Sequence, residues 1–427
     1  MSLGGGTFVS ENKVLPGAYI NFVGLKKADA QLSDRGVVTM PMELNWGADG
    51  EVMEVDLETL LTGAKKIFGY DYTAPELADI RDIFKNANKL YAYRLNAGGQ
   101  KASNTFAEAR YSGIRGNDLT VTIAKNADNA ELFDVSVLLD GKKVDSQTVA
   151  SAADLQANDY VTFKNNATLT ENAGIALSGG TNGTVSGDSH SDYLAKMESY
   201  NFNAMGVKTN DNTIKALYVA YAKRMRDTVG SKFQCVLYNQ AADYEGIVNV
   251  KNTSSIIPWV VGLLGGCAVN KSCSNRVYDG EAEVSADYTQ AQLEQAIKNG
   301  EFTLHKVGDK IKVLTDINSL TTVTNEKGEI FKSNQSIRVM DQIANSIASL
   351  FAEKYLGIVP NNADGRISLW NDIVRIHQQL NDIGAIEDFN DQDIIVIPGS
   401  NKNTVVVNDA VTLVNAMEKL YMTVTVA

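Results

Sequence analysis

The sequence has few of the residues on which metal centres and disulfide frameworks are built. Only three cysteines and three histidines occur among its 427 residues. Cys235, Cys267 and Cys273 are odd in number and form no C-x-x-C pair, which predicts neither a disulfide framework nor a structural zinc site. We therefore expect synthesis in a reducing compartment, with no metal and no cofactor.

The few histidines and cysteines also form no catalytic pattern. His190, His305 and His377 lie far apart in the sequence, and no second ligand stands at metal spacing, as it does in H-E-x-x-H. His377 lies in an expected helix and is interpreted as a helix-surface or interface residue. Cys267 and Cys273 lie in or beside an apolar turn with no nearby histidine or helix start, so small buried side chains are favoured over nucleophiles. We assign no catalytic residue and no enzymatic activity.

The sequence also has no excess of positive charge and no long apolar run. The net charge of −12 comes from 39 Lys and Arg against 51 Asp and Glu, which argues against nucleic acid or an anionic membrane as a partner. The longest nearly apolar stretch, Ile256–Val269, contains one proline and three glycines and is shorter than the roughly 20 residues of a membrane span. We expect buried core with tight turns there and no membrane insertion. Met1–Gly6 has no secretory-signal pattern.

The patterns that are present divide the chain into units of different texture. Helical spacing at Val55–Phe68 and a strand at Leu90–Leu95 begin an α/β layer. Alternating strands follow, two of them joined by the hairpin turn Asp140-Gly141. The α/β texture then resumes, and a strand–helix–strand crossover from Phe202 to Tyr238 favours parallel pairing. Two long amphipathic helices are expected between Ile337 and Ile383.

These patterns predict a multidomain α/β protein, since the length alone favours several domains of about 150 residues. The fold expected is a mixed α/β body with an inserted small all-β domain and an α+β C-terminal domain. The expected units are an N-terminal arm at 1–24, an α/β domain in two parts at 25–116 and 184–330, the inserted β domain at 117–183, and the C-terminal domain with a terminal arm at 331–427.

Both ends of the chain have strand patterns without a hairpin partner of their own. The alternation covers Ala18–Val23 near the start and Leu420–Val426 at the end. An unpaired strand offers a row of backbone donors and acceptors to another chain. We therefore predict that these strands are shared between copies. The alternative, in which both termini complete the sheet of their own domain, stays open.

Several strings, in order along the chain, resemble the tail sheath proteins of contractile phages, especially those of prophages and phage-tail-like bacteriocins of Gram-positive bacteria. The resemblance covers essentially the whole chain. No single string is diagnostic, but their ordered combination is specific. The strings are PGAYINF (Pro16–Phe22), RGVVTMPMELNWG (Arg35–Gly47), GNDL (Gly116–Leu119), LSGGTNG (Leu177–Gly183), DINSLTT (Asp316–Thr322), IRVMD (Ile337–Asp341) and NAMEKLYMTVTV (Asn415–Val426).

This resemblance implies a structural subunit of a contractile sheath. Its partners would be identical subunits in six-membered rings stacked helically, a tail tube protein and a baseplate. The particle would be a virion tail or tail-like particle made in the bacterial host cytoplasm, and its contraction would drive the tube through a target cell envelope. The β insert would be a peripheral domain.

The resemblance also implies strand-exchanging terminal arms. The donated strands would comprise Ala18, Tyr19, Ile20, Asn21, Phe22, Val23, Leu420, Tyr421, Met422, Thr423, Val424, Thr425 and Val426. The acceptor strands in neighbouring C-terminal domains would comprise Ile394, Ile395, Val396, Ile397, Val405, Val406 and Val407. Flexible hinges beside the arms are expected at Ser10–Leu15 and Asn408–Ala410.

Two other classes of function stay open. A surface-binding protein would use the β insert to recognise a receptor. An α/β enzyme would need a pocket with convergent polar groups, for which the sequence supplies no triad, metal motif or phosphate loop.

Overall fold

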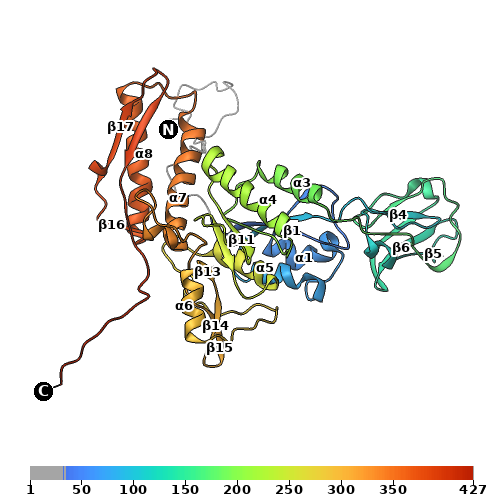
Figure 1. Ribbon diagram of the computed structural model, residues 1–427. Coiled ribbons are helices and arrows are strands. Elements are labelled where there is room, and N and C mark those ends of the chain that lie inside the picture. The colour runs from blue at the N-terminus through green and yellow to red at the C-terminus, as the bar shows by residue number, and fades with distance from the viewer. Residues whose placement is uncertain (1–31, 33–34, 427) are drawn as a thin grey trace, which may run out of the picture.

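The computed structural model describes Leu32 and residues 35–426. Figure 1 shows an α/β body in the middle, a β unit at one end, and a C-terminal part of two long helices and a hairpin at the other. The strand expected at Ala18–Val23 and the hinge expected at Ser10–Leu15 lie outside the described residues.

A seven-stranded sheet forms the centre of the body. Neighbouring strands are parallel, except that the edge strand β2 runs antiparallel to its neighbour, and the expected crossover between Phe202 and Tyr238 is confirmed as a parallel pair joined by a helix. In spatial order the strands are β13 (Glu301–Phe302), β12 (Ile247–Val250), β11 (Gln234–Tyr238), β10 (Ala204–Gly206), β1 (Val37–Met42), β3 (Lys89–Arg94) and β2 (Val52–Asp56).

Helices cover both faces of this sheet, and each face has its own apolar core. One core lies under α1 (Leu57–Phe68), α2 (Ala78–Phe84) and α5 (Ile257–Gly266). The other lies under α3 (Gly187–Met197) and α4 (Asn212–Lys223), where Tyr193 and Tyr218 are fully buried. Because the strands are buried on both sides, they are apolar along most of their length rather than alternating.

Most of the apolar stretch Ile256–Val269 forms the buried helix α5, so the expectation of tight turns was wrong for Ile257–Gly266. Its glycines are contact points for neighbouring backbone. A Cβ at Gly262 would stand 2.3 Å from the carbonyl oxygen of Ile83, and one at Gly266 would stand 1.8 Å from that of Asn86. Glycine is therefore required by the close approach of α2 and its following loop to α5, although in sequence it indicates turns.

The β unit consists of a four-stranded and a two-stranded sheet around one core. The turn Asp140-Gly141 is confirmed, with φ of 54° and 72° at its two residues. Ala102 and Phe106 belong to this core, so the unit begins earlier in the chain than the expected residue 117. The sheets are β7 (Lys142–Val149), β6 (Phe133–Leu139), β5 (Leu119–Lys125) and β9 (Asn172–Ala176), and β4 (Ala107–Ala109) with β8 (Val161–Phe163).

The C-terminal part contains the two expected long helices, α7 (Asn334–Leu350) and α8 (Ala363–Asp382). A π-helical segment, Phe351–Tyr355, extends α7. The antiparallel pairs are β16 (Ile386–Glu387) with β19 (Thr412–Leu413), and β17 (Ile394–Pro398) with β18 (Val405–Asp409). In the chain, α6 (Gln290–Lys298) precedes β13, and the hairpin of β14 (Leu304–Val307) with β15 (Lys310–Val313) follows it.

The hinge expected at Asn408–Ala410 was wrong for its first two residues. Asn408 and Asp409 belong to β18 and pair with Ile395 and Ile394 of β17. Backbone pairing in a ladder restricts the rotations that a hinge needs. Polar side chains at these positions had indicated a loop.

Candidate functional site

The hairpin β17–β18 presents two free edges and a partly apolar outer face. Val396, Val405 and Val407 pack with the core of the C-terminal part, whereas Ile395 and Ile397 are 52% and 42% exposed. Figure 1 shows the hairpin lying along α8, away from the body. Within the described part of the chain the sheet has two strands, so each strand has one edge without a backbone partner. Such an edge can accept a further strand.

An ion pair between a buried histidine and a partly exposed carboxylate holds the hairpin to α8. His377 is 0% exposed, and its Nε2 lies 2.9 Å from Oδ2 of Asp409 on β18. Burial alone would lower the pKa of His377, but the Asp409 carboxylate and the Ile373 carbonyl outweigh it and raise the pKa above its ordinary value. Of the two interpretations of His377, as a helix-surface or an interface residue, the first was wrong, because an apolar strand pair covers this side of α8.

The raised pKa makes the seating of the hairpin depend on pH. Protonated His377 gains an attraction in the folded state, so its stabilisation is fully present below about pH 6.5 and is lost as the pH rises through the folded-state pKa. We expect the difference in Tm between the wild type and Asp409→Asn to be largest near about pH 6 and to shrink toward about pH 8. Thermal unfolding of both proteins across this range checks the expectation, and a difference that is constant with pH would contradict it.

The chain that leaves the hairpin is hydrogen-bonded to the start of α7, and we call this set of contacts the clasp. Nε2 of Gln335 donates to the carbonyl of Val414 at 3.2 Å, and its Oε1 accepts from the backbone N–H of Ala416 at 3.0 Å. Oγ of Ser336 lies 3.0 Å from Oδ1 of Asn415. The buried amide thus bonds the backbone as a neighbouring strand would. This clasp fixes the point from which the C-terminal arm departs.

The clasp ends at Glu418, whose carboxylate accepts hydrogen bonds from Thr315 at 3.0 Å and from Ser274. Residues 414–426 are assigned to neither helix nor strand, and Figure 1 shows the arm running away from the molecule. The strand predicted at its end therefore stays a prediction. The large apolar side chains of the arm are exposed by 68% or more: Met417, Leu420, Tyr421, Met422, Val424 and Val426.

Two buried ion pairs join α7 to the body. Nη1 and Nη2 of Arg226 lie 2.7 and 2.8 Å from the two carboxylate oxygens of Asp341. Nη2 of Arg338 lies 3.1 Å from Oδ2 of Asp316, and both side chains are essentially fully buried. Burial would lower the pKa of each arginine, but the attraction of the carboxylate raises it instead. Both guanidinium groups therefore stay charged at neutral pH, and each ion pair links α7 to the body.

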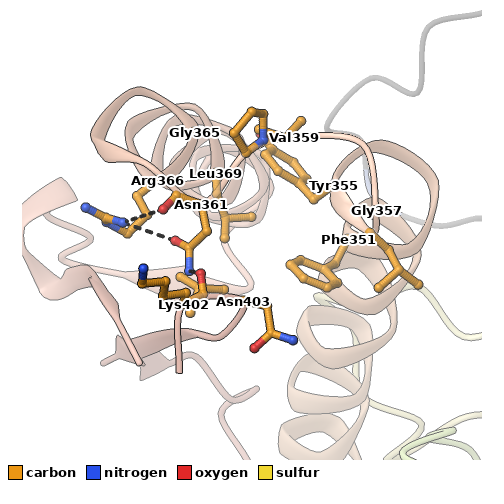
Figure 2. Close-up of a pocket in the computed structure, with 13 residues that line it drawn as sticks. Phe351, Tyr355, Gly357, Val359, Asn361, Gly365, Arg366, Leu369, Lys402 and Asn403 are labelled. Atoms are coloured by element: carbon orange, nitrogen blue, oxygen red, sulfur yellow. Dashed lines mark hydrogen bonds between the residues drawn. The ribbon is translucent and has the colours of Figure 1, made fainter. Parts of the chain in front are cut away.

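A cavity of about 290 Å³ lies between the end of α7, the start of α8 and the β17–β18 loop. Figure 2 shows the side chains that line it. Nδ2 of Asn361 donates to the carbonyls of Lys402 and Thr404 at 3.1 and 2.7 Å, and Nη1 of Arg366 donates to Oδ1 of Asn361 at 3.1 Å. The residues that line the cavity include no carboxylate, thiol or imidazole. They fix the hairpin loop and supply no acid–base pair.

The histidines lie on three different elements. Nδ1 of His190 on α3 is 3.0 Å from the Tyr218 hydroxyl, His305 is on β14, and His377 is on α8. Across residues 35–426, no three His, Cys, Asp or Glu side chains are grouped so as to hold a metal ion. Among the helices of that same range, none combines the length and apolarity of a membrane span.

The acceptor strands expected from sequence are brought together as the hairpin β17–β18. The donor residues Ala18–Val23 are outside the described part of the chain, and Leu420–Val426 project from it unpaired. The sequence did not predict the contacts of Gln335 and Glu418 with the arm, nor the two ion pairs between α7 and the body. A buried polar run at the start of α7 has the same composition as an ordinary exposed first turn, so sequence offered no signal for it.

Models of four sheath domains match the chain in succession. They describe the Gp18 domain III N-terminal region of tail sheath protein (residues 35–95), the phage tail sheath protein beta-sandwich domain (96–182), the phage tail sheath protein central domain (183–319) and the phage tail sheath C-terminal domain (326–427). The matched ranges span nearly all of the described residues.

Whole-length relatives give the same result. The phage-like element PBSX protein XkdK of Bacillus subtilis is 32% identical over 99% of this chain and 100% of its own length. The crystal structure of a sheath tail protein from Desulfitobacterium hafniense is 37% identical, with a TM-score of 0.82 over 95% of this chain and 99% of that one. The contracted helical sheath of the anti-feeding prophage is 13% identical and shares the fold, with a TM-score of 0.56 over 97% and 99%.

These relatives are structural proteins, and they do not favour the receptor-binding alternative. The multidomain α/β architecture with a β-sandwich domain is the one expected from sequence. The chain therefore belongs to the phage tail sheath protein family and is a structural subunit of a contractile sheath in a phage tail or tail-like particle.

Proposed function

We propose that the subunit forms six-membered rings, that the rings stack helically around a tail tube above a baseplate, and that terminal arms hold neighbouring subunits together. Contraction then drives the tube through a target envelope. The particle assembles in the host cytoplasm. The observation that carries this proposal is the exposed apolar C-terminal arm, which leaves the molecule while a two-stranded hairpin of the same chain has open edges.

The arm has the pattern of a donated strand. Leu420, Met422, Val424 and Val426 alternate with Tyr421, Thr423 and Thr425, so an extended arm has one continuous apolar face. The free part after Lys419 reaches about 26 Å at roughly 3.3 Å per residue. Its root is bonded to the start of α7, and the arm points away from its own molecule, as a strand donated to a neighbouring subunit would.

The hairpin is suited to accept it. An isolated two-stranded sheet is marginal in water, and a third strand would satisfy an open edge. The apolar face of the arm would extend the inner face of the hairpin, where Val396 and Val407 already pack on the core. The N-terminal segment Ala18–Val23 would add to the other edge. We thus propose the same donor strands and acceptor strands that the sequence predicts.

A single arm binds a neighbouring subunit weakly, whereas many arms together can hold a lattice of subunits. Each inter-chain hydrogen bond contributes about 0.5–1.5 kcal/mol, and apolar burial adds about 25 cal/mol/Å². Ordering the arm and losing translational freedom oppose this gain. In a lattice every subunit gives and receives arms, so the links act together. Folded domains can then move as rigid bodies on their arms, and contraction needs no nucleotide.

Charging one face of the arm tests this proposal. Met422→Asp with Val424→Asp places two carboxylates on the face that is to be buried, whereas Thr423→Asp with Thr425→Asp places them on the opposite face. Burying an unpaired charge costs several kcal/mol, and each 1.4 kcal/mol is tenfold in association. We expect the first pair to lower the sedimentable polymer at least about tenfold and the second pair to have a smaller effect. Equal effects of the two pairs would contradict a strand with one buried face.

A further inference from the structure

Two of the three cysteines meet at the junction between the body, α7 and the C-terminal arm. Cys267 follows the last residue of α5, and the chain turns back through Ala268–Lys271, so that Cys273 returns beside it. Sγ of Cys267 lies 3.5 Å from the carbonyl oxygen of Lys271, to which Nη1 of Arg338 donates at 2.9 Å. Nη2 of the same Arg338 lies 3.5 Å from Sγ of Cys273, so the two sulfurs flank one guanidinium group. Cys273 is 1% exposed, whereas Cys267 is only partly buried. Cys267 is therefore the more accessible residue of the two.

Two guanidinium groups and one carboxylate face this pair. Nη2 of Arg338 lies 3.5 Å from Sγ of Cys273, and it also bonds Asp316. Arg35 donates to the carbonyls of Leu264 and Cys267, which offsets the negative end of α5 at which Cys267 stands. The hydrogen bond from Cys273 and the charge of Arg338 outweigh burial and the Asp316 carboxylate, and lower the pKa of Cys267 to about 7. The same bond raises the pKa of Cys273.

Cys235 provides the contrast within the same chain. It is fully buried in β11, at the centre of the sheet, and burial raises the pKa of its thiol. A thiol of this kind is inert to reagents in solution. The three cysteines thus divide into an inert one and a close pair.

We propose that Cys267 and Cys273 are a reactive thiol pair that closes to a disulfide by exchange with a low-molecular-weight disulfide. The Cys267 thiolate attacks one sulfur of the reagent, whose S–S bond breaks and releases one thiol that carries the proton lost by Cys267. Cys273 then attacks the Cys267 sulfur and displaces the second thiol, which takes the proton of Cys273. Two protein thiols and one small disulfide become one protein disulfide and two small thiols.

The position of the pair links it to the arm. Ser274, the neighbour of Cys273, donates to Glu418 at the end of the clasp, and Arg338 also donates to the carbonyl of Lys271 at 2.9 Å. A bond between the thiols would add a covalent link to the segment that anchors the arm, which hydrogen bonds alone hold in the reduced form. The pair therefore sits where the redox state of the surroundings can change the stiffness of the arm root.

Incubating the full-length protein with oxidised glutathione tests this proposal. After denaturation and alkylation, we expect a loss of two hydrogen atoms in mass, a linked peptide pair containing Cys267 and Cys273, and a free Cys235. In the untreated protein, iodoacetamide should label Cys267 at least about ten times faster than Cys235. Three free thiols after treatment, a glutathione adduct that stays on Cys267 in the wild type, or a disulfide between two chains would each overturn the proposal.

A single variant separates the two steps of the exchange. Cys273→Ser removes the resolving thiol, so we expect a stable glutathione adduct at Cys267 in place of the internal bond. If Cys273→Ser fails to fold, the peptide map of the wild type still decides the question. If it folds and Cys267 stays unmodified, Cys267 is not the attacking thiol and the proposal fails.

Discussion

A chain that ends after Lys419 should fold normally and should no longer form sheaths. The residues removed are exposed by 68–88% at their large apolar side chains, so their loss takes little buried area from the single subunit. The anchors up to Glu418 are retained. We expect Tm to stay close to that of the full-length chain, as is usual for changes at exposed positions. Coexpression with the tube protein, followed by electron microscopy, should show bare tubes instead of sheathed ones.

A replacement of equal length provides the matched control for the truncation. Exchanging 420–426 for a Gly/Ser sequence keeps the reach of the arm but removes its apolar alternation. We expect this variant to behave as the truncation does. Sheaths of normal length from either chain would show that the C-terminal arm does not hold the lattice together.

Removing one partner of the Arg226–Asp341 ion pair should release α7 from the body. The side chains are 4% and 9% exposed, and Asp341→Ala leaves a buried guanidinium without its carboxylate. Breaking a buried pair in this way costs about 3–5 kcal/mol. Hydrogen exchange is the suitable measurement because a chain of several domains has no single unfolding free energy. The protected amides of α7 should exchange at least about 100-fold faster.

A double replacement separates the charge effect from simple loss of volume. Arg226→Met with Asp341→Leu removes both charges and keeps apolar bulk, and such exchanges are often neutral or stabilising. We expect most of the protection of α7 to return. If the double variant exchanges as fast as Asp341→Ala, the junction depends on the specific hydrogen bonds, including that from Arg226 to Phe233, and not on the unpaired charge.

Sequence predicted those parts of the fold that depend on local patterns. The stripe from Ile367 to Leu380 specifies α8 by itself, and Asp140-Gly141 specifies its hairpin through positive φ. The helix α5 was missed because glycine indicates a turn locally, and only the approach of the backbone at Ile83 shows why it is required in a helix. The early start of the β unit was missed because Phe106 joins its core through tertiary packing.

The candidate site divides in the same way. Alternation predicted the two hairpin strands, since a strand signals its pattern within a few residues, whereas the strand predicted in the arm stays a prediction. The clasp by Gln335, the burial of His377 and the meeting of Cys267 with Cys273 depend on contacts between elements. The spacing of residues in the sequence does not predict these contacts. Each becomes visible only when α7, α8 and the end of α5 are placed in one structure.

A cryo-EM reconstruction of the assembled sheath tests the central claim most directly. The account predicts that Leu420–Val426 is a β-strand hydrogen-bonded to β17 or β18 of a different subunit, with Met422 and Val424 turned toward the core of that neighbour. An arm folded back onto the hairpin of its own subunit, or left unpaired between rings, would contradict it.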